Sequence, residues 1–149
     1  MAQKVKRARD SAARMAKTSK LTMLIVDDHR TVRVRLKALL EEAFPGALVR
    51  EAKDARGLMK LTRAQPWDVV LLDISLPDRS GLDVLPEIKR EQPKTRVLIV
   101  SQHAEEQYGA ASLRAGASGY VTKEKAPERL ANAIRTVLSG RTYFASAGH

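Results

Sequence analysis

Five polar side chains follow apolar runs that have the length and composition of buried β-strands. The runs are LIV, VVLL, VLIV and GYVT, and runs without a polar face are typical of strands covered on both sides, as in a parallel sheet. The polar residues that follow them are Asp27, Asp28, Asp73, Ser101 and Lys123. Because ligands of open α/β sheets bind outside the carboxyl ends of the strands, the spacing predicts a site made of carboxylates, a hydroxyl and an ammonium group.

This set of side chains suits phosphoryl chemistry. Three carboxylates in a partly desolvated pocket repel one another, and a cation would neutralise them. Oxygen ligands with water suit Mg²⁺, whereas a chain without cysteine and without paired histidines does not suit zinc. A metal ion and Lys123 would neutralise the oxygens of a phosphoryl group while the Ser101 hydroxyl donates a hydrogen bond. An aspartate can itself be the nucleophile, and the central position of Asp73 makes it the predicted phosphate acceptor.

The hydrophobic pattern predicts the elements that position these residues. Strands are predicted at 24–26, 48–52, 69–73, 97–100 and 119–122. Helices are predicted at 32–43, from Asp54 to Pro66, from about Asp83 to Glu91, at 105–115, and from Pro127 to Gly140. Strands that alternate with helices predict an α/β fold: a flavodoxin-like, doubly wound, five-stranded parallel sheet in the order 2-1-3-4-5 with five helices. In that order the polar strand ends converge on one edge of the sheet.

Charge and composition divide the chain into a tail and one domain. Residues 1–20 carry seven Lys or Arg against Asp10 alone, so they hold +6 of the net charge of +10. We expect a basic N-terminal extension at 1–20, a single domain at 21–141, and a linker or C-terminal tail at 142–149. The extension is interpreted as a solvated segment, with contact to nucleic acid or an acidic surface as the alternative. The absence of cysteine, of a long apolar run and of a signal-peptide pattern favours a cytoplasmic protein that does not enter a membrane.

Four motifs together resemble a known family. They are LIVDDH at 24–29, VVLLDISLPDRSG at 69–81, VLIVS at 97–101 and GASGYVTK at 116–123. In this order they resemble the CheY-like receiver domain of two-component response regulators, and the resemblance covers about 21–141. The sequence from Gly116 to Phe144 further resembles the subgroup of receivers that precede a LuxR-type helix-turn-helix output domain. Pro often follows the conserved lysine of receivers in a cis bond, but Glu124 follows here, so we expect a trans bond.

The resemblance implies a role for each acidic residue. Asp73 would accept the phosphoryl group from a phosphohistidine of a partner kinase. Asp28 would ligate Mg²⁺ directly and Asp27 mainly through water. Asp73 itself and the backbone carbonyl of Ser75 would complete the protein ligands. The neighbouring His29 is expected to be a loop residue that faces solvent.

The resemblance also implies how the signal is transmitted and lost. Lys123 would contact the phosphoryl oxygens, Ser101 would move to bind them, and Tyr120 would reorient with Ser101. Ser75 and His103 would lie beside the path of the hydrolytic water. His103 would either block this water or hold it, and a solvent-facing histidine without influence is the alternative.

The expected function is a phosphorylation-controlled switch rather than an enzyme, with self-phosphorylation and self-dephosphorylation as its only chemistry. Its expected partner is a sensor histidine kinase or a phosphotransfer protein, with homodimer formation on phosphorylation as a further option. DNA would be bound only through an output domain, for which the nine residues after Gly140 are too few. A stand-alone or degenerate receiver that only binds proteins remains open. A dehalogenase-type phosphohydrolase needs an acid at the position of Ser75, and a nucleic-acid binder needs aromatic platforms or a reading helix.

Overall fold

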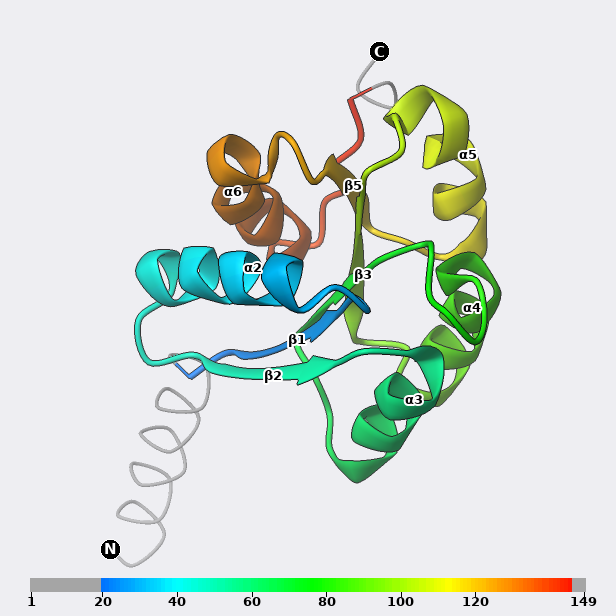
Figure 1. The fold of residues 1–149 in the computed structure, drawn as a ribbon, viewed down its shortest axis with the longest axis horizontal. Coiled ribbons are helices and arrows are strands. Elements are labelled where there is room, and N and C mark those ends of the chain that lie inside the picture. Colours follow the sequence, from blue (N-terminus) through cyan, green and yellow to red (C-terminus); the bar gives the residue numbers. More distant parts are fainter. Residues whose placement is uncertain (1–19, 146–149) are drawn as a thin grey trace, which may run out of the picture.

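The computed structural model describes residues 20–145 and contains one five-stranded sheet with five helices (Figure 1). The strands are β1 (Thr22–Val26), β2 (Leu48–Ala52), β3 (Val69–Leu72), β4 (Arg96–Ser101) and β5 (Gly119–Thr122). The helices are α2 (Arg30–Ala43), α3 (Ala55–Ala64), α4 (Gly81–Glu91), α5 (Glu105–Ala115) and α6 (Ala126–Leu138). All strand pairs are parallel, in the order β2-β1-β3-β4-β5, so the predicted flavodoxin-like fold and strand order are confirmed.

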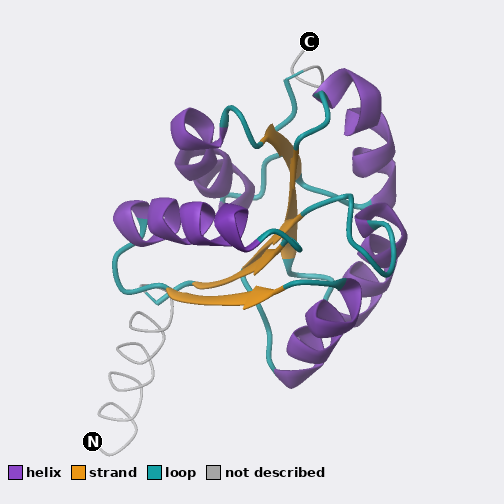
Figure 2. Ribbon diagram, viewed as in Figure 1, coloured by secondary structure: helices purple, strands orange, loops and turns teal. Residues whose placement is uncertain are grey.

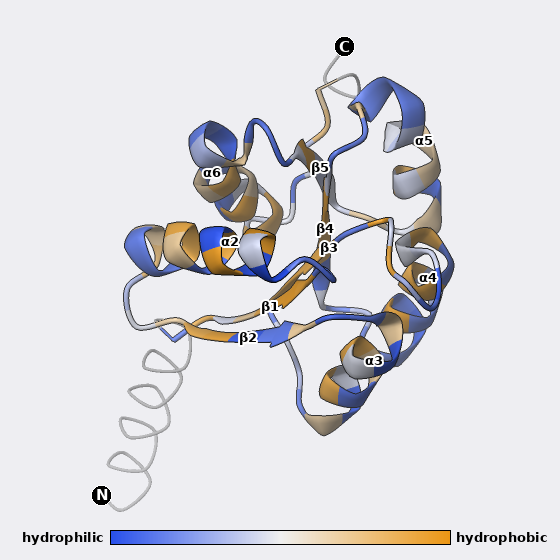
Figure 3. Ribbon diagram, in the orientation of Figure 1, coloured by the Kyte–Doolittle hydropathy of each residue, from blue (hydrophilic) through white to orange (hydrophobic). Residues whose placement is uncertain are grey.

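Helices cover the sheet on both faces (Figure 2). Helices α2 and α6 lie on one face, and α3, α4 and α5 lie on the other. Each face has its own core of buried apolar side chains, and all four residues of β3 are buried. Figure 3 shows the central strands as hydrophobic and the outer sides of the helices as largely hydrophilic. The double covering explains why the strands have no polar face in the sequence.

The helix boundaries differ from the predicted ones at α4. This helix begins at Gly81, two residues before the predicted Asp83, because the Ser80 hydroxyl caps it by accepting a hydrogen bond from the Leu82 N–H at 3.2 Å. Pro86 consequently lies inside the helix, beyond the first turn, where its missing N–H leaves one helical hydrogen bond unmade. The other elements begin and end within two residues of the predicted positions.

Two further predictions concern the ends of the chain and its membrane behaviour. The basic extension lies outside the described residues except for Lys20, and the tail is described only as far as Ala145. Within residues 20–145, no helix has both the length and the apolar composition needed to cross a membrane.

Candidate functional site

The carboxyl ends of the strands bring Asp27, Asp73 and Lys123 into direct contact. The Lys123 Nζ lies 2.8 Å from Asp27 Oδ2 and 3.3 Å from Asp73 Oδ2. The side chains of both aspartates are only 2% exposed, and that of Lys123 is 17% exposed. One half-buried ammonium group therefore lies between two buried carboxylates, as the strand order predicts.

Backbone packing holds Asp73 at the centre of this edge. Its N–H donates to the Val26 carbonyl at 3.0 Å, so it extends the pairing of β3 with β1. Gly81, at the start of α4, packs against the Asp73 backbone, and a Cβ at Gly81 would lie only 2.2 Å from the Asp73 carbonyl oxygen. Only glycine permits this approach, and the Gly81 N–H also donates to the Ile74 carbonyl at 2.7 Å. The loop that follows Asp73 is thus closed by the first turn of α4.

The electrostatic balance leaves Asp73 poorly satisfied. Burial, followed by the nearby charge of Asp27, raises the pKa of Asp73 above its usual value, although Lys123 and the Ser75 N–H oppose this shift. Among the described residues, Asp73 Oδ1 has no hydrogen-bond partner, and Asp27 Oδ2 has its ion pair with Lys123 but no hydrogen bond. Burial alone would lower the pKa of Lys123, but its contacts with Asp27 and Asp73 outweigh burial and raise it. The lysine therefore carries its charge.

A second acidic group lies beside the first, at the turn after β1. Ligand atoms of Asp27, Asp28 and His29 all lie within 4.8 Å of one another. His29 Nδ1 is 3.2 Å from Asp27 Oδ1 and 3.1 Å from Asp28 Oδ1. The predicted solvent-facing position of His29 is correct only in part: its side chain is 63% exposed, but its ring contacts both carboxylates. The carboxylate oxygens of Asp27 and Asp28 are ligands that suit a divalent cation such as Mg²⁺.

The two residues expected to transmit a signal are joined through the loop after β4. Ser101 is fully buried, and its Oγ accepts a hydrogen bond from the His103 N–H at 3.0 Å. Tyr120 is 1% exposed, and its hydroxyl donates to the His103 carbonyl at 2.8 Å. Ser101 and Tyr120 therefore hold the same loop residue from two neighbouring strands. On the other side of this loop, the Lys123 N–H donates to the Ser101 carbonyl at 2.8 Å.

Ser75, two residues after Asp73, contacts His103, two residues after Ser101. The Ser75 Oγ and His103 Nε2 are 3.4 Å apart, so the loops after β3 and β4 touch there. The His103 ring also stacks edge-on against Tyr108, with ring centres 5.1 Å apart. The His103 ring thus contacts both Ser75 and Tyr108. The Lys123–Glu124 bond is trans, as expected, and no peptide bond within residues 20–145 is cis.

Sequence reasoning missed Asp78, which connects the loop between β3 and α4 to the neighbouring helix α3. Its Oδ1 accepts from the Ala55 N–H at 2.9 Å, and its Oδ2 accepts from the Arg56 N–H at 3.0 Å. These N–H groups belong to the first turn of α3 and have no partner within the helix. Asp78 thereby anchors the loop between β3 and α4. Its place within a Pro-Asp turn motif was the available signal, but the sequence does not show which helix it caps.

Comparison with known proteins points to one family. The response regulator receiver domain matches residues 23–135. The response regulator UvrY of Escherichia coli K12 is 36% identical over 126 residues, which cover 85% of this chain and 58% of UvrY. The response regulator GacA of Pseudomonas aeruginosa is 33% identical over 124 residues, which cover 83% of this chain and 58% of GacA. The chain thus spans little more than half the length of these relatives.

Solved structures agree with this assignment. A LuxR-family two-component response regulator from Aurantimonas sp. superposes with a TM-score of 0.77 at 35% identity, covering 83% of this chain and 89% of that one. A Burkholderia pseudomallei response regulator, solved with a phosphorylated aspartic acid, a calcium ion and citrate, has a TM-score of 0.72 at 26% identity and covers 81% of this chain and 70% of that one. The chain belongs to the receiver domain family of two-component response regulators.

Proposed function

We propose that this receiver is switched by transfer of a phosphoryl group from a phosphohistidine to Asp73. The observation that carries the proposal is the state of this side chain: it is buried at the end of the central strand, and its Oδ1 has no hydrogen-bond partner among residues 20–145. A buried, unpaired carboxylate oxygen destabilises a fold and persists where it has another use. The adjacent Lys123 ammonium can bind the oxygens of an incoming anion.

The reaction is a displacement at phosphorus. An oxygen of the Asp73 carboxylate attacks the phosphorus, an O–P bond forms, and the P–N bond to the donor imidazole breaks with its electron pair staying on nitrogen. The Lys123 ammonium, now 3.3 Å from the carboxylate, would contact the oxygens of the resulting acyl phosphate. Ser101 would turn its hydroxyl from the His103 N–H towards the same oxygens. The protein supplies position and charge, so it acts as a switch with self-phosphorylation and self-dephosphorylation only.

The acidic pocket would hold the metal ion that this transfer requires. Receiver domains bind a divalent metal at an acidic pocket, and the group of Asp27, Asp28 and His29 provides acidic ligands here, next to Asp73, which shares the Lys123 ammonium with Asp27. We propose Mg²⁺, with Asp28 and Asp73 as direct ligands, Asp27 mainly through water, and the Ser75 carbonyl. When bound, the ion supplies positive charge to the phosphoryl oxygens. Lys123 keeps Asp27 and Asp73 together in the absence of the ion.

The lifetime of the acyl phosphate on Asp73 would depend on two loop residues, Ser75 and His103. Ser75 has a short side chain and leaves room for water, whereas His103 contributes a ring that is held against Tyr108. We propose that His103 controls the approach of the water that hydrolyses the acyl phosphate. Tyr120 would reorient as Ser101 moves. On phosphorylation, the conformation of segment 104–120 should change most, because α5 is weakly packed: Gly109 and Ser112 are its only buried residues.

The partners and output follow from the relatives. We propose a sensor histidine kinase or phosphotransfer protein as the donor, self-association on phosphorylation, and a role in the cytoplasm. The domain would span 21–141, with an extension at 1–20 and the start of a linker at 142–149. Two relatives are named as transcriptional regulators, so we propose regulation of transcription through a DNA-binding domain outside these residues. A receiver that acts only as a protein-binding module is the second candidate, because the site residues alone do not show reactivity.

Intact-mass measurement after incubation with acetyl phosphate and Mg²⁺ tests the proposal. We expect one added phosphoryl group that is lost at alkaline pH, and no addition to Asp73→Asn. Asp78→Asn is the matched control, because Asp78 lies five residues further along the same loop and should leave labelling intact. Equal labelling of Asp73→Asn would move the acceptor elsewhere, and no labelling of the parent would favour the protein-binding module.

A further inference from the structure

The segment after α6 lies along the open edge of the sheet. Strand β5 is the last strand in the order, so its outer backbone groups have no strand partner. The Tyr143 N–H donates to the Ser118 carbonyl at 2.8 Å, and the Tyr120 N–H donates to the Tyr143 carbonyl at 2.9 Å. Gly119 and Tyr143 form a parallel bridge (Figure 1, red segment beside β5). Residues 142–144, which we call the edge segment, thus continue the sheet beyond β5.

Gly119 makes this contact sterically feasible. A Cβ at this position would lie 2.9 Å from the Tyr143 carbonyl oxygen, 3.0 Å from the Tyr143 Cβ and 2.8 Å from Leu98 Cδ1. Gly119 is not among the described glycines with positive φ, so its backbone conformation would accept other residues. The need for glycine therefore comes from the close approach of Tyr143 on the outer side of β5 and of the Leu98 side chain on β4. The missing Cβ at Gly119 therefore lets the edge segment approach β5 closely.

The side chains of the edge segment pack on both faces of the sheet. Tyr143 packs against the core under α2 and α6. Phe144 packs against the core under α3, α4 and α5, which includes the Tyr120 ring. This alternation is that of a β-strand. The edge segment is consequently held by two backbone hydrogen bonds and by an apolar contact on each face.

A short chain of hydrogen bonds joins the edge segment to Ser101. The Tyr120 N–H binds the Tyr143 carbonyl, and the Tyr120 hydroxyl donates to the His103 carbonyl. The His103 N–H in turn donates to Ser101 Oγ. If the Ser101 hydroxyl turns towards a phosphoryl group, His103 loses this acceptor, and the Tyr120 hydroxyl, which is bonded to the His103 carbonyl, would move with the loop. A cavity of about 240 Å³ lies beside Tyr143 and Phe144 and leaves space for a movement of the edge segment itself.

We propose that the edge segment is a conformational latch: it docks as a sixth strand on β5 in the unphosphorylated receiver and is loosened by phosphorylation of Asp73. The coupling, though not the docking, rests on the proposed function. The latch would convert a movement of Ser101 into a change in the backbone that leaves the domain after α6. The segment that occupies the open edge of β5 is part of this chain, because Gly119 leaves room for the close approach of Tyr143.

Hydrogen exchange at the Tyr143 and Tyr120 amides tests the docking. In the unphosphorylated protein we expect both amides to be protected, because each donates a hydrogen bond within the added strand. Gly119→Ala should accelerate exchange at Tyr143 by about tenfold or more. Gly109→Ala is the matched control, because its methyl group would meet only the flexible Glu105 side chain, with Cγ at 2.9 Å. Tyr143→Pro, which removes the donor without altering β5, should expose the Tyr120 amide. Full protection in both variants would overturn the docking.

The coupling is tested on the same samples after incubation with acetyl phosphate and Mg²⁺, with intact mass recorded beside exchange. Faster exchange at Tyr143 in the phosphorylated protein supports the latch. A phosphorylated protein with unchanged protection at Tyr143 overturns the coupling and leaves the proposed function standing. If no phosphoryl group is added, the proposed function fails instead. A second variant tests the coupling without phosphorylation. Tyr120→Phe removes only the hydrogen bond to the His103 carbonyl and should accelerate exchange at the Tyr143 amide. Exchange at Tyr143 equal to that of the parent would count against the coupling.

Discussion

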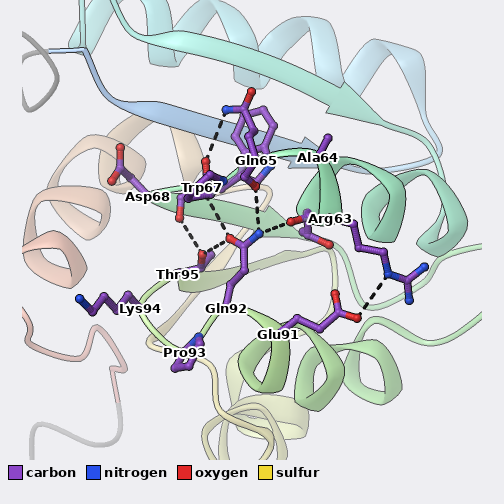
Figure 4. A pocket seen from close by; sticks show the side chains of 12 residues that line it. Arg63, Ala64, Gln65, Trp67, Asp68, Glu91, Gln92, Pro93, Lys94 and Thr95 are labelled. Atoms are coloured by element: carbon purple, nitrogen blue, oxygen red, sulfur yellow. Dashed lines mark hydrogen bonds and ion pairs between the residues drawn. The ribbon is translucent and has the colours of Figure 1, made fainter.

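The two ends of the sheet differ in whether their buried polar groups have hydrogen-bond partners. At the carboxyl ends of the strands, Asp27 and Asp73 share the Lys123 ammonium, and Asp73 Oδ1 has no hydrogen-bond partner among the described residues. At the other end, a cavity of about 860 Å³ lies between the ends of α3 and α4, and the polar groups around Gln92 in it are paired with one another (Figure 4). The first end contains the candidate site, and the second closes the fold.

The amide of Gln92 is the centre of the paired end. Its Oε1 accepts from the Trp67 N–H at 3.2 Å and lies 2.8 Å from the Thr95 hydroxyl. Its Nε2 donates to the Gln65 carbonyl at 2.9 Å and to the Thr62 carbonyl. The Trp67 ring N–H donates to the Leu61 carbonyl at 2.9 Å. One side chain at the end of α4 thus satisfies backbone groups at the end of α3 and at the start of β3.

The contrast separates structural polar groups from functional ones. A polar group whose partners are all supplied by the protein stabilises one conformation. A buried charge that lacks partners lowers stability and remains available to a ligand. Substitutions should therefore have opposite effects on stability at the two ends.

The largest effect is expected at the paired end. Gln92→Ala would leave several backbone groups without partners, so we expect the free energy of unfolding to fall by about 2–3 kcal/mol. Urea unfolding followed by circular dichroism measures the change. Gln65→Ala is the matched control, because its side chain makes only one long contact, 3.4 Å to the Pro66 carbonyl. Equal losses in both variants would remove the special role of Gln92.

Mg²⁺ should stabilise the folded protein only through the carboxyl ends of the strands, where the acidic residues lie. At a Mg²⁺ concentration ten times the dissociation constant, binding to the folded state alone adds about 1.4 kcal/mol. A Tm titration with Mg²⁺ should show this gain in the parent and in Gln92→Ala, and little gain in Asp28→Ala. A parent Tm that does not respond to millimolar Mg²⁺ would contradict the metal site.

Removing the buried negative charge of Asp73 should increase stability. The pKa of Asp73 is raised in the folded state, so the folded protein holds this proton more tightly than the unfolded chain does. Stability consequently falls as the pH rises from the ordinary value of 3.8 through the raised pKa, and the penalty is complete above it. Asp73→Asn lacks this penalty, and its Tm at pH 7 should exceed that of the parent by about 2–4 °C. The difference should shrink towards acidic pH, and a lower Tm at pH 7 would show that the Lys123 contact dominates.

The smallest effect is expected at Asp78, in the same loop. The N–H groups of Ala55 and Arg56 lower the pKa of Asp78, so its contribution is present above the ordinary value of 3.8 and is lost as the pH falls through the lowered pKa. Because the side chain is exposed, Asp78→Ala should lose less than about 1 kcal/mol at pH 7. Thermal unfolding at pH 7 and pH 3 compares the two states. A loss of the same size at both values would mean that the carboxylate charge has no part in the cap.

The sequence by itself determined the elements and the edge at which the site lies. Strands with no polar face and helices with apolar residues at helical spacing are local patterns, and parallel pairing puts their carboxyl ends together. Asp27, Asp73 and Lys123 could therefore be brought together from the sequence alone. Ser75 and His103, which the resemblance placed on the same side of the site, lie 3.4 Å apart, and their role towards water stays a prediction.

Only the tertiary structure decided contacts that depend on how loops and helix ends pack. It joined the Asp78 loop to α3, turned the His29 ring onto two carboxylates, and gave Gln92 its partners 25 to 30 residues earlier in the chain. It also brought Tyr143 to the edge of β5, where Gly119 leaves room for it. Such contacts join residues without a periodic relation, so their geometry is set by the packing of the whole domain and leaves no local pattern in the sequence.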